Sequence, residues 1–324
     1  MKAVRIHGYG GPEVLVYEDV PTPELKPEQV LVRVEAATVN PIDVAVREDR
    51  FPTPKSPPKT IGSDGAGVVA AVGADVAGVS AGERVFFSGL GIGSEGSYAE
   101  YAVIHEAQAV PIPDGLSAAD AAALGMVFPT AYYALVTRGA VQAGETVLVQ
   151  GAAGGVGSAS VQLAKAFGAR VIGTVGSEAE AELVRSLGAD ETIDYKREDV
   201  AARALELTAG KGVDLVHELV ISANLPADVR LVAKGGRIVC TGQGPSPEVI
   251  VPIGAALAKD VTLLFMSLNN AGRAGVAKIA AEVARMAADG KVRPVIGATL
   301  PLAEARRAHE LLAADHVGKI VLVP

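Results

Sequence analysis

The sequence contains one cysteine, no tryptophan and few aromatic residues of any kind. Cys240 alone can form neither an internal disulfide nor a zinc site with several thiolate ligands. Aromatic residues make up 4% of the 324 residues, which disfavours stacking platforms for bases or sugars. Positive charge is also scarce, because 29 Lys and Arg face 37 Asp and Glu and give a formal net charge of −8. A surface that follows nucleic-acid phosphates needs clustered positive charge, so we expect no nucleic-acid partner.

Signals for export or membrane insertion are missing as well. Residues 1–7 alternate between polar and apolar types, whereas a signal peptide has a continuous apolar core. No uninterrupted apolar run approaches the ~18 residues of a membrane span. Apolar residues nevertheless make up 49% of the chain, enough for a sizeable core. We therefore expect a soluble, cytoplasmic protein of a reducing compartment, with no membrane partner.

The length of the chain and a change of pattern along it indicate two domains. At about 150 residues per domain, 324 residues correspond to two. Roughly the first 110 residues are typical of short strands broken by Gly and Pro, with strands expected at 30–36, 65–72 and 84–87. The proline-rich stretch 52–58 is expected to be a surface loop, because each Pro removes a backbone donor and constrains its neighbour.

From Ser117 onward, strand and helix patterns alternate. We expect strands at 146–150, 170–175, 191–195, 213–219, 237–241 and 319–323, and helices at 118–124, 130–137, 157–167, 179–187, 200–208, 225–232, 271–289 and 302–313. Alternation at this spacing predicts a parallel sheet with helices on both faces. The sequence therefore predicts an α/β protein in which a β-rich domain precedes a doubly wound domain.

A glycine-rich turn joins the strand at 146–150 to the helix that follows it. Gly154 and Gly157 keep the three-residue spacing of a dinucleotide-binding fingerprint, although Ala152 stands at the position of its first glycine. Gly154 would let the backbone approach a pyrophosphate, Gly157 would allow close helix–strand packing, and the helix N-terminus would offer free N–H groups. No Gly-Lys-Ser/Thr follows, so a nucleoside triphosphate is disfavoured. A dinucleotide cofactor is favoured over a plain tight turn.

The end of the strand at 170–175 favours NADPH over NADH. NAD sites tend to place an acid there, which bonds the ribose 2′-hydroxyl. Here Gly-Ser at 176–177 leaves room for a 2′-phosphate, which Tyr195 and the basic pair 196–197 could approach from the neighbouring strand. Glu178 and Glu180 would repel that phosphate if they faced it, but we expect both to be exposed acids in the first turn of a helix.

Several motifs spread over nearly the whole chain resemble one family. They are the opening Met1–Arg5, Val39-Asn40-Pro41, Gly62–Val69, the loop Ala152–Gly157, His217–Leu225, Lys234–Val239, Pro294–Gly297 and Gly318–Leu322. On these motifs the chain is similar to the zinc-free quinone oxidoreductases of the medium-chain dehydrogenase/reductase superfamily, most closely the zeta-crystallin type.

The resemblance implies a GroES-like β-rich substrate domain at 1–123, to which 268–324 return, and a Rossmann NADP-binding domain at 124–267, with the active site in the cleft between them. It also implies two catalytic residues near the nicotinamide, Asn40 as an orienting amide and Thr130 as a hydroxyl donor. Each has a structural alternative: Asn40 as the cap of a turn before Pro41, and Thr130 as a helix cap after Pro129. The cofactor-binding residues that it implies are Asn40, Thr130, Gly154, Gly155, Val156, Gly176, Ser177, Tyr195, Ser222, Thr241, Gly242, Gln243, Ser267 and Lys319.

Further expectations come from the family analogy and from departures from it. The analogy and the apolar run 261–266 predict a homodimer formed by extension of the cofactor-domain sheet near 249–267. Relatives often carry a tyrosine where this chain has Ala45, which affects the shape of the substrate pocket. Some relatives use a lysine on the 2′-phosphate where this chain has Glu180, which affects the preference for NADPH.

The ligands of a catalytic zinc are missing from the sequence. Such a site needs thiolate and imidazole ligands, but the positions that supply them in the zinc enzymes of this superfamily are Asn40 and Ser63 here. The five histidines show no ligand spacing, and His309 and His316 are expected to be solvated surface residues. We therefore expect no metal.

Without a metal, a conjugated acceptor is easier to reduce than a simple ketone, because delocalisation spreads the charge that arrives with the hydride. The leading hypothesis is NADPH-dependent, metal-free hydride transfer to quinones. One alternative is reduction of the conjugated C=C bond of an enone or enoyl thioester, which Ala45 favours. An alternative of another class is a non-catalytic, NADPH-binding structural or RNA-binding protein. No general acid is assigned: Asp43 and Tyr132 are candidates, and water can also supply the proton.

Overall fold

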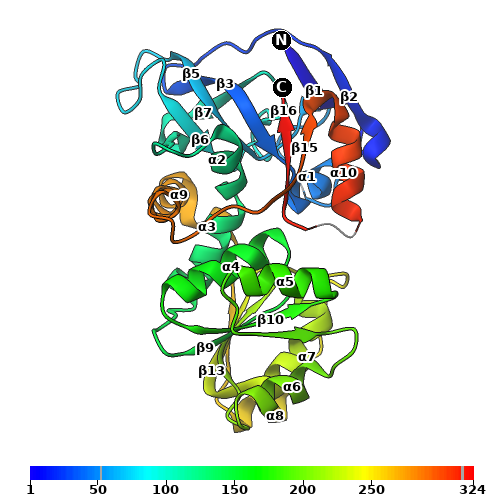
Figure 1. Ribbon diagram of the computed structural model, residues 1–324. Helices are drawn as coiled ribbons and strands as arrows, with labels where there is room; N and C mark the ends of the chain where they lie inside the picture. The colour runs from blue at the N-terminus through cyan, green and yellow to red at the C-terminus, as the bar shows by residue number, and fades with distance from the viewer. Residues whose placement is uncertain (52, 315–316) are drawn as a thin grey trace. The chain divides into compact units, whose positions relative to one another are not determined.

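The N-terminal and C-terminal segments of the chain fold together, and the segment between them forms a unit of its own (Figure 1). The computed structural model describes residues 1–51, 53–314 and 317–324. The first unit comprises Met1–Met126 and Ala271–Pro324, and the second comprises Val127–Asn270.

The first unit is built mainly of antiparallel strands. Its strands are β1 (Lys2–Ile6), β2 (Leu15–Asp19), β3 (Gln29–Thr38), β4 (Lys59–Thr60), β5 (Asp64–Val72), β6 (Arg84–Phe87), β7 (Tyr101–His105), β8 (Val110–Pro111), β15 (Ile296–Pro301) and β16 (Lys319–Val323). Among its described residues, a larger sheet runs in the order β15-β16-β3-β5-β6-β8, with β7 paired to β3, and a smaller one in the order β2-β1-β4. β16, the last strand of the chain, therefore pairs with the C-terminal end of β3, a strand of the N-terminal segment.

The core of the first unit follows from the alternation of β3. Val30, Val32 and Val34 point to the interior, as the two-residue period of a strand requires, and Ile320 and Leu322 of β16 join them in one apolar cluster. The helices of this unit are α1 (Pro41–Arg47), α2 (Ala118–Leu124), α9 (Gly272–Ala288) and α10 (Ala305–Ala313), with 3-10 turns at Pro12–Val14, Glu106–Gln108 and Leu302–Glu304. A further 3-10 turn, Leu268–Ala271, spans the boundary with the second unit. The C-terminal strand β16 therefore contributes to the same apolar core as the N-terminal strands β1 and β3.

The second unit, every residue of which is described, is a doubly wound α/β fold. Its elements are α3 (Val127–Tyr132), a π-helix (Tyr133–Arg138), β9 (Thr146–Val149), α4 (Gly155–Ala166), β10 (Arg170–Val175), α5 (Glu178–Ser186), β11 (Glu191–Asp194), α6 (Val200–Leu207), β12 (Val213–Glu218), α7 (Ile221–Leu231), β13 (Val232–Cys240), α8 (Ile253–Ala258) and β14 (Thr262–Phe265). The parallel strands run in the order β11-β10-β9-β12-β13-β14. Helices α4 and α5 cover one face and α6, α7 and α8 the other (Figure 1), which explains the nearly continuous apolar runs of the central strands. The predicted combination of a GroES-like and a Rossmann fold is confirmed.

The structure corrects the predicted elements around α7 and after it. Helix α7 begins at Ile221 rather than 225, because the N–H groups of Ile221 and Ser222 donate to the carbonyls of Gly242 and Gln243 instead of to a local cap. These bonds join distant segments, so the sequence contains no signal for them. Strand β13 begins at Val232 rather than 237, and α8 and β14 were not expected as separate elements. The helix expected at 130–137 is divided between α3 and the π-helix.

Two expectations about exposed or apolar segments can be compared directly with the structure. Residue 52 of the proline-rich stretch lies outside the described residues, and 53–58 contain neither helix nor strand, which confirms the loop. In the described parts of the chain, one helical stretch, Ala118–Arg138, is long and apolar enough to cross a membrane by length and composition. Two thirds of its apolar window (67%) is buried inside the protein, which is typical of a core helix.

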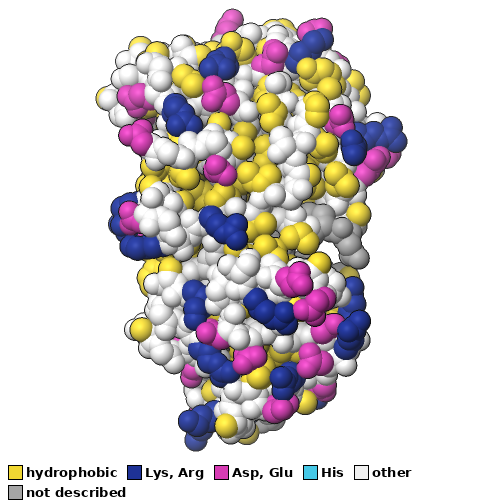
Figure 2. Space-filling view, viewed as in Figure 1, with side chains coloured by type: hydrophobic (Ala, Val, Ile, Leu, Met, Phe, Trp, Pro, Cys, Tyr) yellow, Lys and Arg dark blue, Asp and Glu magenta, His cyan; other side chains and the backbone are white. Residues whose placement is uncertain are grey.

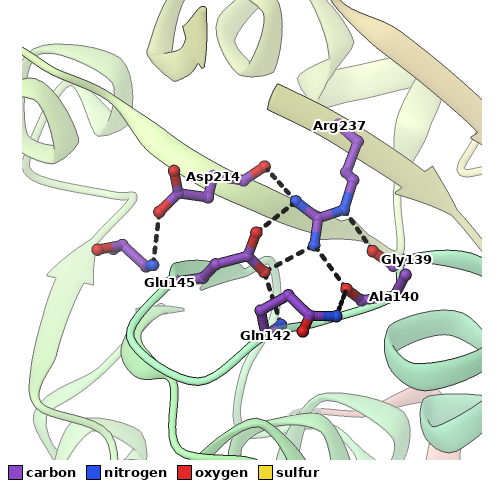
Figure 3. A network of polar contacts seen from close by, with 7 residues as sticks. Gly139, Ala140, Gln142, Glu145, Asp214 and Arg237 are labelled. Carbon is purple, nitrogen blue, oxygen red and sulfur yellow. Dashed lines mark hydrogen bonds and ion pairs between the residues drawn. The ribbon is translucent and has the colours of Figure 1, made fainter. Parts of the chain in front are cut away.

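An arginine at the N-terminal end of the parallel sheet fixes the entry to β9 (Figure 3). The guanidinium of Arg237 donates to both carboxylate oxygens of Glu145, at 2.9 and 2.6 Å. It also donates to the carbonyl oxygens of Gly139, Ala140 and Asp214. Because all of its nitrogen atoms are engaged, Arg237 holds the loop before β9 against β12 and β13.

Candidate functional site

Buried polar side chains surround the start of α1 in the first unit. Asn40 occupies the capping position, and its backbone N–H donates to Oδ2 of Asp43 at 2.8 Å. Its side-chain Nδ2 donates to Oδ2 of Asp64 at 2.8 Å and to Oγ of Ser63 at 3.0 Å. Its Oδ1 accepts a hydrogen bond from Nζ of Lys319 at 2.5 Å. The structure thus brings together two predicted site residues, Asn40 and Lys319, and places Asn40 at the capping position of α1 with its side chain bonded elsewhere; a catalytic role for Asn40 stays a prediction.

Burial shifts the titration of the charged members of this cluster. Burial first, and then the Asp64 carboxylate, raises the pKa of Asp43 to about 7, against opposing effects of the Asn40 N–H and Lys319. Burial also raises the pKa of Asp64 and lowers that of the Lys319 amine. Oδ1 of Asp64 is buried without a hydrogen-bond partner among the described residues. Asp43 is therefore a carboxyl group that can hold or release a proton near neutral pH.

The cluster continues to a histidine that the sequence placed wrongly. His309 was expected at the solvated surface, but it is 1% exposed, because α10 packs onto the first unit's core. Its Nδ1 lies 3.0 Å from Nη1 of Arg47 and its Nε2 lies 3.3 Å from the hydroxyl of Tyr98. That hydroxyl donates to Asp43 at 3.2 Å. Burial, and then Arg47, lowers the pKa of His309 to about 3, so the ring is neutral at physiological pH. His316 lies outside the described residues.

The loop between β9 and α4 in the second unit has the backbone of a phosphate cradle. The N–H groups of Gly151 and Ala152 donate to the hydroxyl and carbonyl oxygens of Thr174, each at 2.9 Å. A Cβ added to Gly157 would lie 2.1 Å from the carbonyl oxygen of Gly151, so only glycine fits there. A Cβ added to Gly154 would lie 3.4 Å from the same oxygen, an ordinary contact. Gly157 therefore serves packing, and Gly154 leaves the outer face of the loop open.

The N-terminus of α4 offers donors to this open face. Gly154 is the capping residue, no side chain forms a capping hydrogen bond, and the first turn contains no acidic residue. The N–H groups of the first turn, contributed by Gly155, Val156 and Gly157, have no partner within the helix. Such a terminus favours a bound anion through both its donors and its dipole. The residues present therefore fit the pyrophosphate of a dinucleotide.

Three predicted residues lie together at the end of β10. An ideal Cβ on Gly176 would lie 2.5 Å from the hydroxyl of Tyr195 and 3.1 Å from Cε of Lys196. Ser177 follows as the cap of α5, and its hydroxyl accepts a hydrogen bond from the Glu180 N–H at 3.3 Å. Gly176 is itself buried, and the phenol and the amine beside it are groups that donate hydrogen bonds to a phosphate such as that of the NADPH ribose.

The expectation that both acids of α5 are exposed holds for one of them. The Glu178 side chain is 73% exposed and pairs with Arg185 at 2.9 Å. Glu180 is half-buried instead, and its Oε2 accepts a hydrogen bond from the Gly176 N–H at 2.7 Å. A carboxylate so close to the end of the second strand is the feature by which NAD sites hold a 2′-hydroxyl. Its charge would oppose a 2′-phosphate that Lys196 attracts.

A pocket of about 370 Å³ in the second unit collects four of the remaining predicted residues. They are Ser222, Thr241, Gly242 and Gln243. Ser267 is exposed and directly follows Met266, which also lines this pocket.

Thr130 is buried in the interior of α3, so the alternative of a helix cap is wrong, while its role as a hydroxyl donor stays a prediction.

A histidine that the sequence did not single out lies behind this pocket. His217 is fully buried, with Nδ1 2.8 Å from the hydroxyl of Ser160 on α4 and Nε2 2.8 Å from the hydroxyl of Thr241. Burial lowers its pKa to about 3. It therefore acts as a neutral link between the helix that follows the glycine loop and the end of β13. Its two partners are distant in sequence, so only the fold reveals the arrangement.

Metal ligation finds no support in the side chains that the structure describes. No group of three or more His, Cys, Asp or Glu residues among them could hold a metal ion. Asn40 and Ser63, which stand where the zinc enzymes of the superfamily have ligands, are hydrogen-bonded to each other at 3.0 Å.

Two family models match the chain. Residues 26–114 match the alcohol dehydrogenase GroES-like domain, and residues 155–287 match the zinc-binding dehydrogenase model. The quinone oxidoreductase of Homo sapiens is 34% identical over 326 residues, which cover 100% of this chain and 98% of the relative. The quinone oxidoreductase of Pseudomonas aeruginosa is 38% identical, with 100% and 99% of the two chains covered.

Solved structures of two differently named enzymes are similar to the chain over its whole length. A crystal structure of an NAD-dependent alcohol dehydrogenase is 35% identical, with a TM-score of 0.93 and 100% of both chains covered. The crystal structure of the Escherichia coli quinone oxidoreductase complexed with NADPH is 30% identical, with a TM-score of 0.91 and again 100% of both chains covered.

Proposed function

The chain belongs to the quinone oxidoreductases of the medium-chain dehydrogenase/reductase superfamily, and on that premise we propose that it transfers a hydride from NADPH to quinones or similar conjugated carbonyl acceptors without a metal. The observation that carries this proposal is the open glycine loop at 151–157, which leads into the uncapped N-terminus of α4. It is a ready-made site for paired phosphates.

We assign NADPH to the second unit and the acceptor to the first. The N–H groups of Gly155 and Val156 would hold the pyrophosphate, and Tyr195 with Lys196 would hold the phosphorylated ribose. Bound NADPH supplies the hydride and the electrons of the reaction. Asn40 and Thr130 remain the proposed catalytic residues.

Proton supply is assigned to the buried cluster at α1. The Asp43 carboxyl has a pKa raised to about 7 and is linked through Tyr98 to His309. A group with a pKa near the working pH is both an adequate acid and an adequate base.

A metal-free reaction is supported by the side chains at the positions of the zinc ligands, because the amide of Asn40 and the hydroxyl of Ser63 are poor ligands for zinc.

The test is the oxidation of NADPH, followed by its absorbance, in the presence of small ortho- and para-quinones. We expect turnover that requires both the enzyme and the quinone. The absence of turnover across a broad panel of quinones would reject the proposal.

A second candidate is reduction of a conjugated C=C bond, which is favoured by Ala45. This residue is half-buried in α1, where a methyl group takes the place of the tyrosine often found in relatives. Values of kcat/KM for enones and quinones decide between the two reactions. A preference for quinones above tenfold would discard the enone reaction.

A non-catalytic, RNA-binding role is the candidate of another class. In each unit, the surface visible in Figure 2 intersperses Lys and Arg with Asp and Glu instead of forming a stripe of one sign. Together with the net charge of −8, this speaks against a phosphate-binding surface, and we propose no nucleic-acid partner. Tight NADPH binding without catalysis, combined with salt-sensitive retention of RNA, would revive this role.

We also propose a cytoplasmic homodimer. β14 is the edge strand of the second unit's sheet, and Phe265 at its end is 63% exposed. Ile253 and Leu257 of the adjacent α8 are 66% and 73% exposed, so this edge presents apolar surface that a second copy could cover. The only cysteine, Cys240, is buried and unpaired, in keeping with a reducing compartment. A monomeric mass in light scattering at micromolar concentration would contradict the dimer.

A further inference from the structure

A chain of hydrogen bonds runs from the glycine loop into the interior of the second unit. The N–H of Gly151 donates to Oγ1 of Thr174 at 2.9 Å, and the Thr174 hydroxyl donates to Oε1 of Gln150 at 2.9 Å. Nε2 of Gln150 donates to Oδ1 of Asp228 on α7 at 2.8 Å. The direction of each bond is fixed, because a backbone N–H can only donate and an amide oxygen can only accept. The chain therefore reaches Asp228 at an oxygen that acts as an acceptor.

A second carboxyl group, at the end of β12, completes the chain. Oε1 of Glu218 accepts hydrogen bonds from the backbone N–H of Val220 and from Nδ2 of Asn224, the latter at 3.3 Å. The other oxygens, Oδ2 of Asp228 and Oε2 of Glu218, are buried without a hydrogen-bond partner in this fully described unit. Both residues are 0% exposed, and Asn224, which donates to Glu218, lies one helical turn before Asp228 on the same face of α7. A single proton between the two unpartnered oxygens would satisfy both and would avoid two adjoining buried charges.

Each end of the chain lies beside a segment assigned to NADPH. Gly151 opens the glycine loop, and Val220 directly precedes α7, whose second residue, Ser222, lines the 370 Å³ pocket. Resting on the function proposed above, we propose that Asp228 and Glu218 are positioning residues that share one proton and thereby hold these two segments in the arrangement that binds NADPH. Neither residue contacts the cofactor in this assignment. They act through Gln150 and Thr174 on one side and through the Val220 N–H on the other.

The donors that reach the pair, from Gln150, Val220 and Asn224, are all neutral, so none of them cancels a negative charge. Burial first, and then the Glu218 carboxylate, raises the pKa of Asp228 well above its usual value, while the Gln150 amide opposes the rise. On β13 the facing group is the thiol of Cys240, whose own pKa burial raises to about 12, with further contributions from both acids. Loss of the proton at alkaline pH would place two negative charges side by side in the interior and break the link.

The test uses two variants of Asp228 in the full-length protein. In Asp228→Asn, the amide oxygen can still accept from Gln150 and the amide nitrogen can donate to Glu218, so a fixed donor replaces the shared proton. In Asp228→Leu, neither bond can form. The exposed capping residue Asp199 of the same unit, changed to Asn, is the control for the loss of a carboxylate.

We measure the dissociation constant of NADPH by calorimetry between pH 6 and pH 10, together with thermal unfolding of each variant. At pH 7 we expect Asp228→Asn to bind within about threefold of the parent and Asp228→Leu about tenfold or more weakly, since buried partners are left unpaired. The parent and the Asp199 control should lose affinity at alkaline pH with the release of one proton, whereas Asp228→Asn should not.

The outcomes separate this inference from the proposed function. If Asp228→Asn weakens with pH as the parent does, or if folded Asp228→Leu binds NADPH as tightly as the parent, the positioning role is wrong and the function stands. If the parent binds no NADPH at any pH, both are wrong. A merely structural role would lower the unfolding temperature of Asp228→Leu without changing the dissociation constant of its folded form. Should that variant not fold, the pH profile of Asp228→Asn decides alone.

Discussion

Replacement of Gly157 by alanine should disturb the phosphate cradle, the loop 151–157, more than the addition of a methyl group at any other glycine of that loop. The added Cβ would lie 2.1 Å from the carbonyl oxygen of Gly151 and 2.8 Å from Cα of Ala152, both of them backbone atoms. To restore the ordinary contact of 3.4 Å, the loop would have to move by roughly 1.3 Å relative to α4. The donors of the α4 N-terminus and the turn that faces them would then no longer match one pyrophosphate.

The size of the effect follows from this displacement. Overpacking of a tightly packed contact costs about 1–3 kcal/mol of the free energy of unfolding. A hydrogen bond to a charged group such as the pyrophosphate contributes about 1.5–3 kcal/mol, and about 2.8 kcal/mol corresponds to 100-fold in affinity. We therefore expect Gly157→Ala to unfold with about 2 kcal/mol less free energy and, with one or two of these bonds lost, to bind NADPH about 100-fold more weakly.

Two control variants separate the clash from the general effect of alanine. Gly254, in α8, has no atom within 4 Å of an added Cβ, so Gly254→Ala should leave NADPH binding unchanged. Gly154→Ala makes only the ordinary 3.4 Å contact, so its free energy of unfolding should stay within about 0.5 kcal/mol of the parent while NADPH binds more weakly at the blocked outer face. Calorimetric titration and urea unfolding measure both quantities. Binding of NADPH to Gly157→Ala within threefold of the parent would refute the reasoning.

Three further predictions concern the second unit. The ratio of NADPH affinity to NADH affinity, measured by titration, should rise about threefold or more in Glu180→Gln, because this change removes a negative charge that opposes the 2′-phosphate. The ratio should fall in Lys196→Gln, because this change removes a positive charge that attracts the 2′-phosphate. Equal ratios in the parent and both variants would contradict this. The buried His217 binds its proton only near pH 3, whereas the unfolded chain binds it near pH 6.5, so the free energy of unfolding should fall as the pH drops below 6.5. In His217→Gln this fall should be shallower by about 1.4 kcal/mol per pH unit, as measured by urea unfolding between pH 6 and pH 4.5. Equal pH dependence of the parent and the variant would contradict this. Arg237→Met should lower the free energy of unfolding by about 3 kcal/mol, because it leaves the Glu145 carboxylate without its ion-pair partner, and Arg237→Lys should lower it less. A loss below about 1 kcal/mol for Arg237→Met in chemical unfolding would show that the network is not stabilising.

The cofactor cradle was accessible from the sequence because its determinants are local. The spacing of Gly154 and Gly157, a buried strand before them and a helix after them lie within about twenty residues, and each reflects a short-range steric demand. The strand end at Gly176 is likewise set by local sequence. The structure confirms the elements that this reasoning placed around the loop.

The buried networks were not accessible, because their partners are far apart in the chain. The bond between Lys319 and Asn40 joins residues 279 positions apart, and that between Arg47 and His309 joins residues 262 positions apart. A histidine in an amphipathic helix gives no sign of the element that will cover it, so His309 was placed at the surface. The start of α7 was missed for the same reason, since carbonyls near Gly242 take the place of a local cap.

Hydride transfer itself is tested most directly with protein that has been stripped of metal by chelation and dialysis. The enzyme, NADPH and a para-quinone are mixed without oxygen, and the loss of NADPH absorbance is compared with the amount of hydroquinone formed. We expect catalytic turnover with one hydroquinone per NADPH, at a rate that the removal or addition of zinc does not change. No turnover, or turnover that appears only when zinc is restored, would contradict it.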